Sequence, residues 1–130
     1  MYLDAIDLRE FYNSRLGRQT RTRLRTKIRH IWPKVAGDRV LGIGYPTPFL
    51  RPFIGEAERV LAFMPASQGV FRWPQDEPSA TALVNEHMLP LPDAAVDRVL
   101  LTHSLEMTDN PRELLGEIWR ILSPGGRLLV

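Results

Sequence analysis

The sequence contains no cysteine, and that absence excludes several classes of protein. Without thiols, the 130-residue chain forms no disulfides, no thiolate metal site and no cysteine nucleophile. It also lacks any apolar run near the ~20 residues that span a bilayer. Its first residues include Asp4, Asp7 and Glu10 and show no apolar signal core. These absences predict a cytoplasmic protein with no transmembrane segment and no targeting peptide.

The sequence also lacks the common catalytic and metal-binding motifs. It contains no HExxH motif, paired carboxylates, catalytic triad or cluster of zinc ligands. We therefore predict that the protein holds no metal. The absence of these motifs also means that no catalytic residue is identified in this way.

Positive charge is concentrated at the start of the chain. Residues 1–40 carry ten Lys or Arg and four Asp or Glu, whereas residues 41–130 carry seven and eleven. Such a basic segment suits the phosphates of RNA or of an anionic membrane, but it is more typical of the solvated face of a packed helix, because cationic faces are common on soluble helices. Few aromatic residues are interleaved for base stacking, which weakens the nucleic-acid interpretation. The basic stripe consists of Arg18, Arg21, Arg25 and Arg29.

Residues 4–32 have the periodicity of a helix. Gly17 is expected to break this run into two helices, and the Trp32-Pro33 pair should end it, because the residue before a proline is disfavoured in helical geometry. The apolar stripe recurs at three- or four-residue spacing and comprises Tyr12, Leu16, Thr20, Leu24, Ile28 and Ile31.

A strand, a glycine turn and a helix start follow one another next. Residues 39–43 form an apolar strand and Gly44 ends it. Thr47 suits the N-cap of a helix over residues 48–56, which Pro52 should shorten or distort. This layout is typical of a cofactor-binding loop at the carboxyl end of a parallel strand.

The remaining chain alternates strands with helical or loop segments. Asn110, Pro111 and Glu113 supply a complete N-terminal cap for a helix over residues 110–122. Residues 64–69 are expected to form a loop and residues 70–78 a proline-broken linker. The alternation predicts an α/β fold with a doubly wound, mainly parallel sheet and helices on both faces. Further strands are predicted over residues 58–63, 80–84, 97–102 and 127–130.

Five short motifs follow one another in the second half of the chain, namely Leu89-Pro-Leu-Pro, Val96-Asp97, Thr102-His103, Glu117-Ile-Trp-Arg and Leu122-Ser-Pro-Gly-Gly-Arg127. In this order and spacing they resemble class I methyltransferases that use S-adenosylmethionine (SAM), in particular the type 11 group. The resemblance implies a Rossmann-like sheet of order 3-2-1-4-5 over residues 37–130, preceded by a helical extension over residues 1–36. It also implies a chain truncated after its fifth strand, whose free edge a second copy or a partner chain would cover.

The same resemblance implies a cofactor site at the carboxyl ends of the strands, with SAM as cofactor and S-adenosylhomocysteine as product. His103 follows the fourth strand and is a candidate general base, although a lone histidine there is often a structural group. The implied cofactor-binding residues are Gly42, Gly44, Tyr45, Thr47, Met64, Asn85, Glu86 and His103.

Several of these positions depart from the family pattern. Gly42 stands where the family has an acidic residue, and Pro46 and Pro48 replace loop glycines. Proline offers no backbone N–H and stiffens the loop. Met64 stands where a carboxylate would accept hydrogen bonds from the ribose hydroxyls, and a thioether cannot replace it. These departures predict weakened cofactor binding.

The predicted function is therefore SAM-dependent methyl transfer to an unidentified acceptor, weak or absent in this short chain. Two alternatives stay open. The domain could keep the fold as a non-catalytic module for protein association, or it could bind nucleic acid or an anionic surface through its basic N-terminal helix.

Overall fold

The structure, a computed structural model, describes residues 4–65 and 80–130. Its strands form a single parallel sheet in the order β3-β2-β1-β4-β5, which confirms the predicted fold class. The linker predicted over residues 70–78 lies outside the described residues. The strands are β1 (Arg39–Gly44), β2 (Arg59–Pro65), β3 (Thr81–Val84), β4 (Val96–Thr102) and β5 (Leu122–Leu129).

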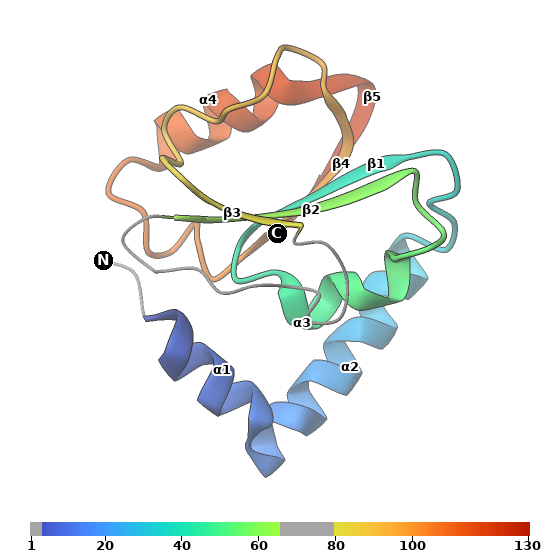
Figure 1. Cartoon of the computed structure of the whole chain (residues 1–130), viewed down its shortest axis with the longest axis vertical. Helices are drawn as coiled ribbons and strands as arrows, with labels where there is room; N and C mark the ends of the chain where they lie inside the picture. Colours follow the sequence, from blue (N-terminus) through green and yellow to red (C-terminus); the bar gives the residue numbers. More distant parts are fainter. Residues whose placement is uncertain (1–3, 66–79) are drawn as a thin grey trace.

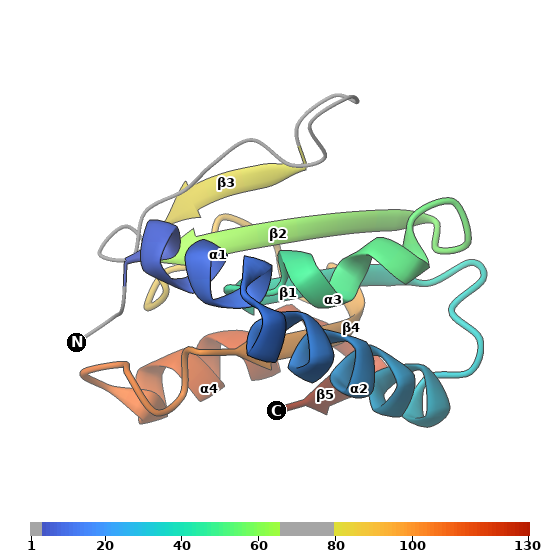
Figure 2. The same cartoon turned by 90° about the horizontal axis from the view of Figure 1, so that it is seen from below.

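Helices cover both faces of the sheet (Figures 1 and 2). One face carries α1 (Ala5–Asn13), α2 (Arg15–Ile31), α3 (Thr47–Leu50) and the 3-10 turn η1 (Arg51–Phe53). The other face carries α4 (Pro111–Ile121). The sheet thus separates two hydrophobic cores, as expected of a doubly wound sheet.

The central strand β1 supplies side chains to both cores. Val40 packs with the core under α1 and α2, whereas Leu41 and Ile43 pack with the core under α4. Successive side chains of a strand point to opposite faces, so a strand buried on both faces must be apolar throughout. In the described residues every helix is too short or too polar to cross a lipid bilayer.

The sequence had suggested that the N-terminal helices break at Gly17, whereas in the structure the break lies at Ser14. The Ser14 hydroxyl accepts a hydrogen bond from the Gly17 N–H at 3.1 Å and so caps α2. A Cβ on Gly17 would lie 1.8 Å from the Phe11 carbonyl oxygen, so glycine permits the tight corner. After this corner α2 does not bury the whole of the predicted apolar stripe. Three of its members are exposed, namely Leu16, Leu24 and Ile31.

The short helix after β1 begins one residue earlier than predicted. Pro46 is its N-cap and makes no side-chain capping bond, whereas Thr47 is already helical. Pro52 distorts the segment as expected, because α3 ends at Leu50 and continues only as the 3-10 turn η1.

Half of the predicted cap of α4 is confirmed, and two strand bounds are wrong. The Asn110 side chain accepts a hydrogen bond from the Glu113 N–H at 3.2 Å, whereas the Asn110 N–H donates to the Thr108 hydroxyl at 3.4 Å. Strand β5 begins at Leu122, directly after α4 and five residues before the predicted strand, with a register shift opposite β4. Strand β2 continues to Pro65, so Met64 lies within it and not in a loop.

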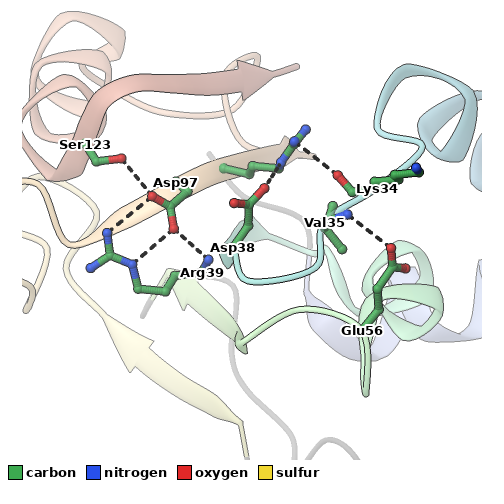
Figure 3. Close-up of polar contacts among 8 residues, drawn as sticks. Lys34, Val35, Asp38, Arg39, Glu56, Asp97 and Ser123 are labelled. Carbon is green, nitrogen blue, oxygen red and sulfur yellow. Dashed lines mark hydrogen bonds and ion pairs between the residues drawn. The ribbon is translucent and has the colours of Figure 1, made fainter.

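A carboxylate links three strands at the amino end of the sheet (Figure 3). Asp97 of β4 accepts hydrogen bonds from the backbone N–H and Nε of Arg39 at 2.8 and 3.1 Å. The Ser123 hydroxyl of β5 donates to the same carboxylate at 2.9 Å. The Arg39 hydrogen bonds are the main reason that the pKa of Asp97 falls to about 2. This carboxylate therefore fixes the starts of β1, β4 and β5 relative to one another.

We expect Asp97→Asn to lower the free energy of unfolding by about 1–2 kcal/mol near neutral pH. The folded-state pKa of Asp97 is depressed to about 2. Its contribution is therefore fully present above the unfolded-state pKa of about 3.9 and is lost as the pH falls through about 2. Urea denaturation at neutral and at strongly acidic pH measures both values.

Asp93→Asn is the matched control, because the Asp93 side chain is 81% exposed in its ion pair with Arg120. It should change the free energy of unfolding little at either pH. A loss for Asp97→Asn that is the same at neutral and acidic pH would contradict the assigned role.

Candidate functional site

The predicted site lies where β1 ends and the chain turns into α3. Gly44 has a φ of +101°, in the region that favours glycine, and a Cβ there would lie 1.9 Å from the Thr102 carbonyl oxygen. The next residue, Tyr45, donates its backbone N–H to that same oxygen at 3.0 Å. The turn is therefore pressed against the carboxyl end of β4.

Pro46 folds back over β1 and occupies the space beside Gly42. A Cβ on Gly42 would lie 2.3 Å from Pro46 Cβ and 2.8 Å from Leu50 Cδ1. Real side-chain contacts are never this short, so this position accepts only glycine while Pro46 keeps its place. Thus the family's usual acidic side chain has no room here, and the sequence alone gave no sign of this packing.

The turn offers few backbone donors to a ligand. Pro46 and Pro48 have none, and the Tyr45 N–H is used by Thr102. The N–H groups of Phe49 and Leu50 both donate to the Pro46 carbonyl, at 2.9 and 3.1 Å. The Thr47 N–H is the donor that remains for a ligand, because no backbone carbonyl of the described residues accepts a hydrogen bond from it.

An aromatic cluster packs beside the turn. The Tyr45 ring is 2% exposed, and burial raises its pKa to about 12. It stacks on Tyr12 of α1 with ring centroids 6.0 Å apart, and Phe49 meets Tyr12 edge-on at 5.5 Å. Because Tyr12 comes from the N-terminal helix, sequence reasoning placed it only in an apolar stripe and missed its place at the site.

His103 is held by the same tyrosine. The Tyr12 hydroxyl lies 2.6 Å from His103 Nε2. Burial raises the pKa of Tyr12 and lowers the pKa of His103, so both groups are neutral near pH 7. The tautomer of His103 sets the direction of this hydrogen bond: the hydroxyl donates when the ring proton is on Nδ1 and accepts when it is on Nε2. His103 also has a φ of +49°, an uncommon conformation for a residue with a side chain.

The other predicted residues lie at the ends of β2 and β3. Met64 is fully buried and pairs with Leu83 of β3. Asn85 is exposed, and its Oδ1 accepts from the His87 N–H at 3.0 Å. Glu86 is buried and accepts a hydrogen bond from the Thr108 hydroxyl at 3.3 Å.

The structure thus brings Gly44, Tyr45, Thr47 and His103 together at the ends of β1 and β4, and Asn85 and Glu86 directly follow β3 at the same carboxyl edge of the sheet. The assignment of these residues, and of Gly42 and Met64, to a cofactor stays a prediction. In the described ranges no group of three or more His, Asp or Glu side chains is arranged to hold a metal ion.

A cavity of about 580 Å³ opens from His103 between α2 and the edge of the sheet. Its walls are mostly apolar, and its polar groups include Tyr12, His103, Glu106 and Lys27. A molecule in this cavity would lie beside His103 and Tyr12.

Two arginines of the basic stripe of α2 are engaged in contacts with neighbouring elements. Arg25 donates its Nε to the Pro48 carbonyl, and Arg29 pairs with Glu56 and lies over the Phe53 ring. Both therefore hold α2 against α3 and η1, which favours the packed-helix interpretation for these two arginines.

Comparisons with known proteins agree with this fold. The family model described as "Methyltransferase domain" matches residues 42–130. No curated protein has a matching sequence.

Several solved structures share the fold. The [4+2]-cyclase SpnF is 25% identical with a TM-score of 0.67, and the match covers 82% of this chain and 42% of that one. A SAM-dependent methyltransferase from Archaeoglobus fulgidus is 20% identical (TM-score 0.68; 95% and 55% covered). One from Mesorhizobium loti is 21% identical (TM-score 0.61; 79% and 50% covered). This chain therefore spans about half the length of these proteins.

The site fits SAM only in part. Tyr45 and Met64 are buried and offer almost no surface to a ligand. Met64, and not a carboxylate, occupies the position near the end of β2. Apart from Thr47, the backbone donors of the turn are absent or used internally. The residues present therefore do not fit the ribose diol or the carboxylate of the cofactor.

We expect Gly42→Ala to destabilise the fold strongly, by about 3 kcal/mol or more, since the new methyl group overlaps Pro46 and Leu50. Pro46→Gly alone should cost about 1 kcal/mol through added chain entropy. The double variant should be more stable than the sum of the two losses predicts, because Pro46→Gly removes the clashing ring. Chemical denaturation of all four proteins completes this double-mutant cycle.

Gly116→Ala is the control for an added methyl group, because nothing lies within 4 Å of a Cβ at that helical position. It should be neutral or slightly stabilising. Strictly additive losses for Gly42→Ala and Pro46→Gly would show that Pro46 does not occupy the space beside Gly42.

Proposed function

Because the chain belongs to the methyltransferase-domain family, we propose that it takes part in SAM-dependent methyl transfer. The observation that carries the proposal is the family match over residues 42–130 on a sheet of order β3-β2-β1-β4-β5. SAM would supply an activated methyl group, and the protein would bind and orient the reactants. Residues 1–36 would act as a helical extension of the domain at residues 37–130.

We assign the acceptor to the cavity of about 580 Å³ beside His103. Its apolar walls favour an acceptor with an apolar body, and His103 would contact the group to be methylated. With its ring proton on Nε2 and donated to the Tyr12 hydroxyl at 2.6 Å, the neutral imidazole would take up the acceptor's proton at Nδ1, and Tyr12 would fix the orientation of the ring.

Cofactor binding by this chain is proposed to be weak. Two missing hydrogen bonds to charged or polar groups, at about 1.5–3 kcal/mol each, correspond to affinity lower by about 10²- to 10⁴-fold. The Thr47 N–H and the exposed Asn85 side chain are the polar groups proposed to meet the cofactor, whereas Tyr45 and Met64 are buried and are proposed to support the site from within the core.

A second candidate function is protein association without catalysis, and the partial fit to SAM favours it. Within residues 4–65 and 80–130, strand β5 pairs on one side only, with β4. Trp119 is 81% exposed, and it lines a further cavity of about 840 Å³ between α4 and β5 together with Leu115 and Leu128. An unpaired edge beside apolar side chains is a template for pairing with another chain. We propose that a second copy or a partner chain covers this edge.

Isothermal titration of the purified chain with SAM and S-adenosylhomocysteine tests the first function. We expect weak binding that Asn85→Ala weakens further and Asn85→Asp strengthens, because a carboxylate is the better acceptor for the adenine amine. Asn13→Ala is the control, since Asn13 is exposed at the α1–α2 corner, away from the sheet (Figure 1).

Absence of binding at millimolar ligand concentrations, with the chain shown to be folded, would reject methyl transfer by this chain and favour the association module. Binding that Asn85→Ala leaves unchanged would keep the cofactor but overturn the placement of its adenine at the end of β3.

Sedimentation over a range of protein concentrations tests the edge of β5. We expect self-association that Leu128→Lys reduces, because a lysine on an edge strand opposes pairing with another chain. Arg112→Gln, an exposed change on α4, is the control. If the protein stays monomeric at all concentrations, a second copy does not cover the edge of β5. A different partner chain would then be the remaining candidate.

A further inference from the structure

Three arginines converge where α2 packs on α3 and η1. Arg21 and Arg25 are one helical turn apart on α2, and i,i+4 positions lie on the same helix face. Arg25 reaches α3 and donates its Nε to the Pro48 carbonyl. Arg51 begins η1, three residues after Pro48. The positive charges of Arg21 and Arg51 both act on Arg25.

No acidic side chain neutralises this cluster within the residues that the structure describes. Glu56, a carboxylate of the adjoining segment, pairs with Arg29. From Phe11 to Gly37 the sequence has eight Lys or Arg and no Asp or Glu. Burial, together with the charges of Arg21 and Arg51, lowers the pKa of Arg25, so its surroundings oppose a positive charge.

Arg21 also has a buried hydrogen-bond donor that no described residue satisfies. Its Nε is buried, and among the described residues nothing accepts a hydrogen bond from it. A buried charged donor without an acceptor is costly, and such a group calls for an explanation such as a bound ion.

The geometry points to an anion-binding site formed by Arg21, Arg25 and Arg51 that takes a phosphate group. A phosphate oxygen would accept from Arg21, and the planar guanidinium groups of Arg25 and Arg51 offer further donors. A doubly charged anion would relieve the mutual repulsion of the three arginines. The site lies on the helical layer and does not depend on the proposed methyl transfer.

A compact phosphate, free or as a phosphomonoester, suits the cluster better than a nucleic-acid backbone. A backbone needs a row of free cations, whereas Arg29 is already paired with Glu56. The three arginines instead meet at one place, and the aromatic residues beside them in the described chain, Phe49 and Phe53, are buried and cannot stack on a base.

Thermal unfolding in inorganic phosphate and in chloride at equal ionic strength tests the site. We expect phosphate to raise the Tm of the unchanged chain, because a ligand that binds only the folded state stabilises it. Titration should show that Arg51→Gln weakens phosphate binding about tenfold or more. Arg51 is exposed, so this variant should fold normally. Arg21→Gln should have a similar effect.

Arg23→Gln is the matched control, because Arg23 is an exposed arginine of the same helix outside the cluster. It should keep the phosphate effect in full. No rise in Tm with phosphate, or an equal rise in the control, Arg21→Gln and Arg51→Gln, would overturn the site.

Single-stranded RNA and phosphatidylcholine vesicles containing phosphatidic acid distinguish the sources of the phosphate. If free phosphate displaces either probe from the unchanged chain but not from Arg51→Gln, the probe binds at the same site, and this result would support the proposal. Binding of RNA or vesicles that Arg23→Gln weakens as much as Arg51→Gln would show a diffuse basic surface and overturn the compact site.

Discussion

The close contact between Gly44 and Thr102 is the constraint on which the carboxyl edge of the sheet depends. The Gly44 backbone approaches the Thr102 carbonyl so closely that no side chain fits, and Tyr45 then donates its N–H to that oxygen. This pair of contacts joins the end of β1 to the end of β4. It also directs the Tyr45 ring into the core, where Tyr12 stacks on it. The turn, the N-terminal helix and His103 are thereby held in one cluster.

The prolines of the turn decide how much of a cofactor site is left. Pro46 occupies the space beside Gly42, and neither Pro46 nor Pro48 can donate a hydrogen bond. A glycine-rich turn would present its N–H groups to a ligand, whereas this turn uses most of its own internally. The same substitutions that stabilise the turn against β1 therefore reduce its ability to bind an anionic or hydroxylated ligand. The family fold is kept more completely than the features that would hold SAM.

Charges on the helical layer show a similar division between packing and binding. Arg25 and Arg29 were predicted as one stripe, yet their contacts hold α2 to α3 and η1 through Pro48 and Glu56. Arg29 is neutralised by its partner, whereas Arg25 stands between two further arginines. Periodicity along a helix places side chains on one face, but only the neighbouring elements decide which charges stay unbalanced.

Local patterns in the sequence were enough to predict helices on both faces of a parallel sheet and the capping of α4 by Asn110, because apolar runs, turn residues and caps act through short-range geometry. The strand order, and the placement of Gly44 and His103 at the same edge, were predicted from the family motifs. Three features depended on tertiary structure: the corner at Ser14, the filling of the space beside Gly42, and the bond from Tyr12 to His103. The first two are contacts between residues three or four positions apart, and the packing of the helices on the sheet decides which local geometry is adopted. The third joins residues 91 positions apart, and no spacing along the chain encodes where such segments meet.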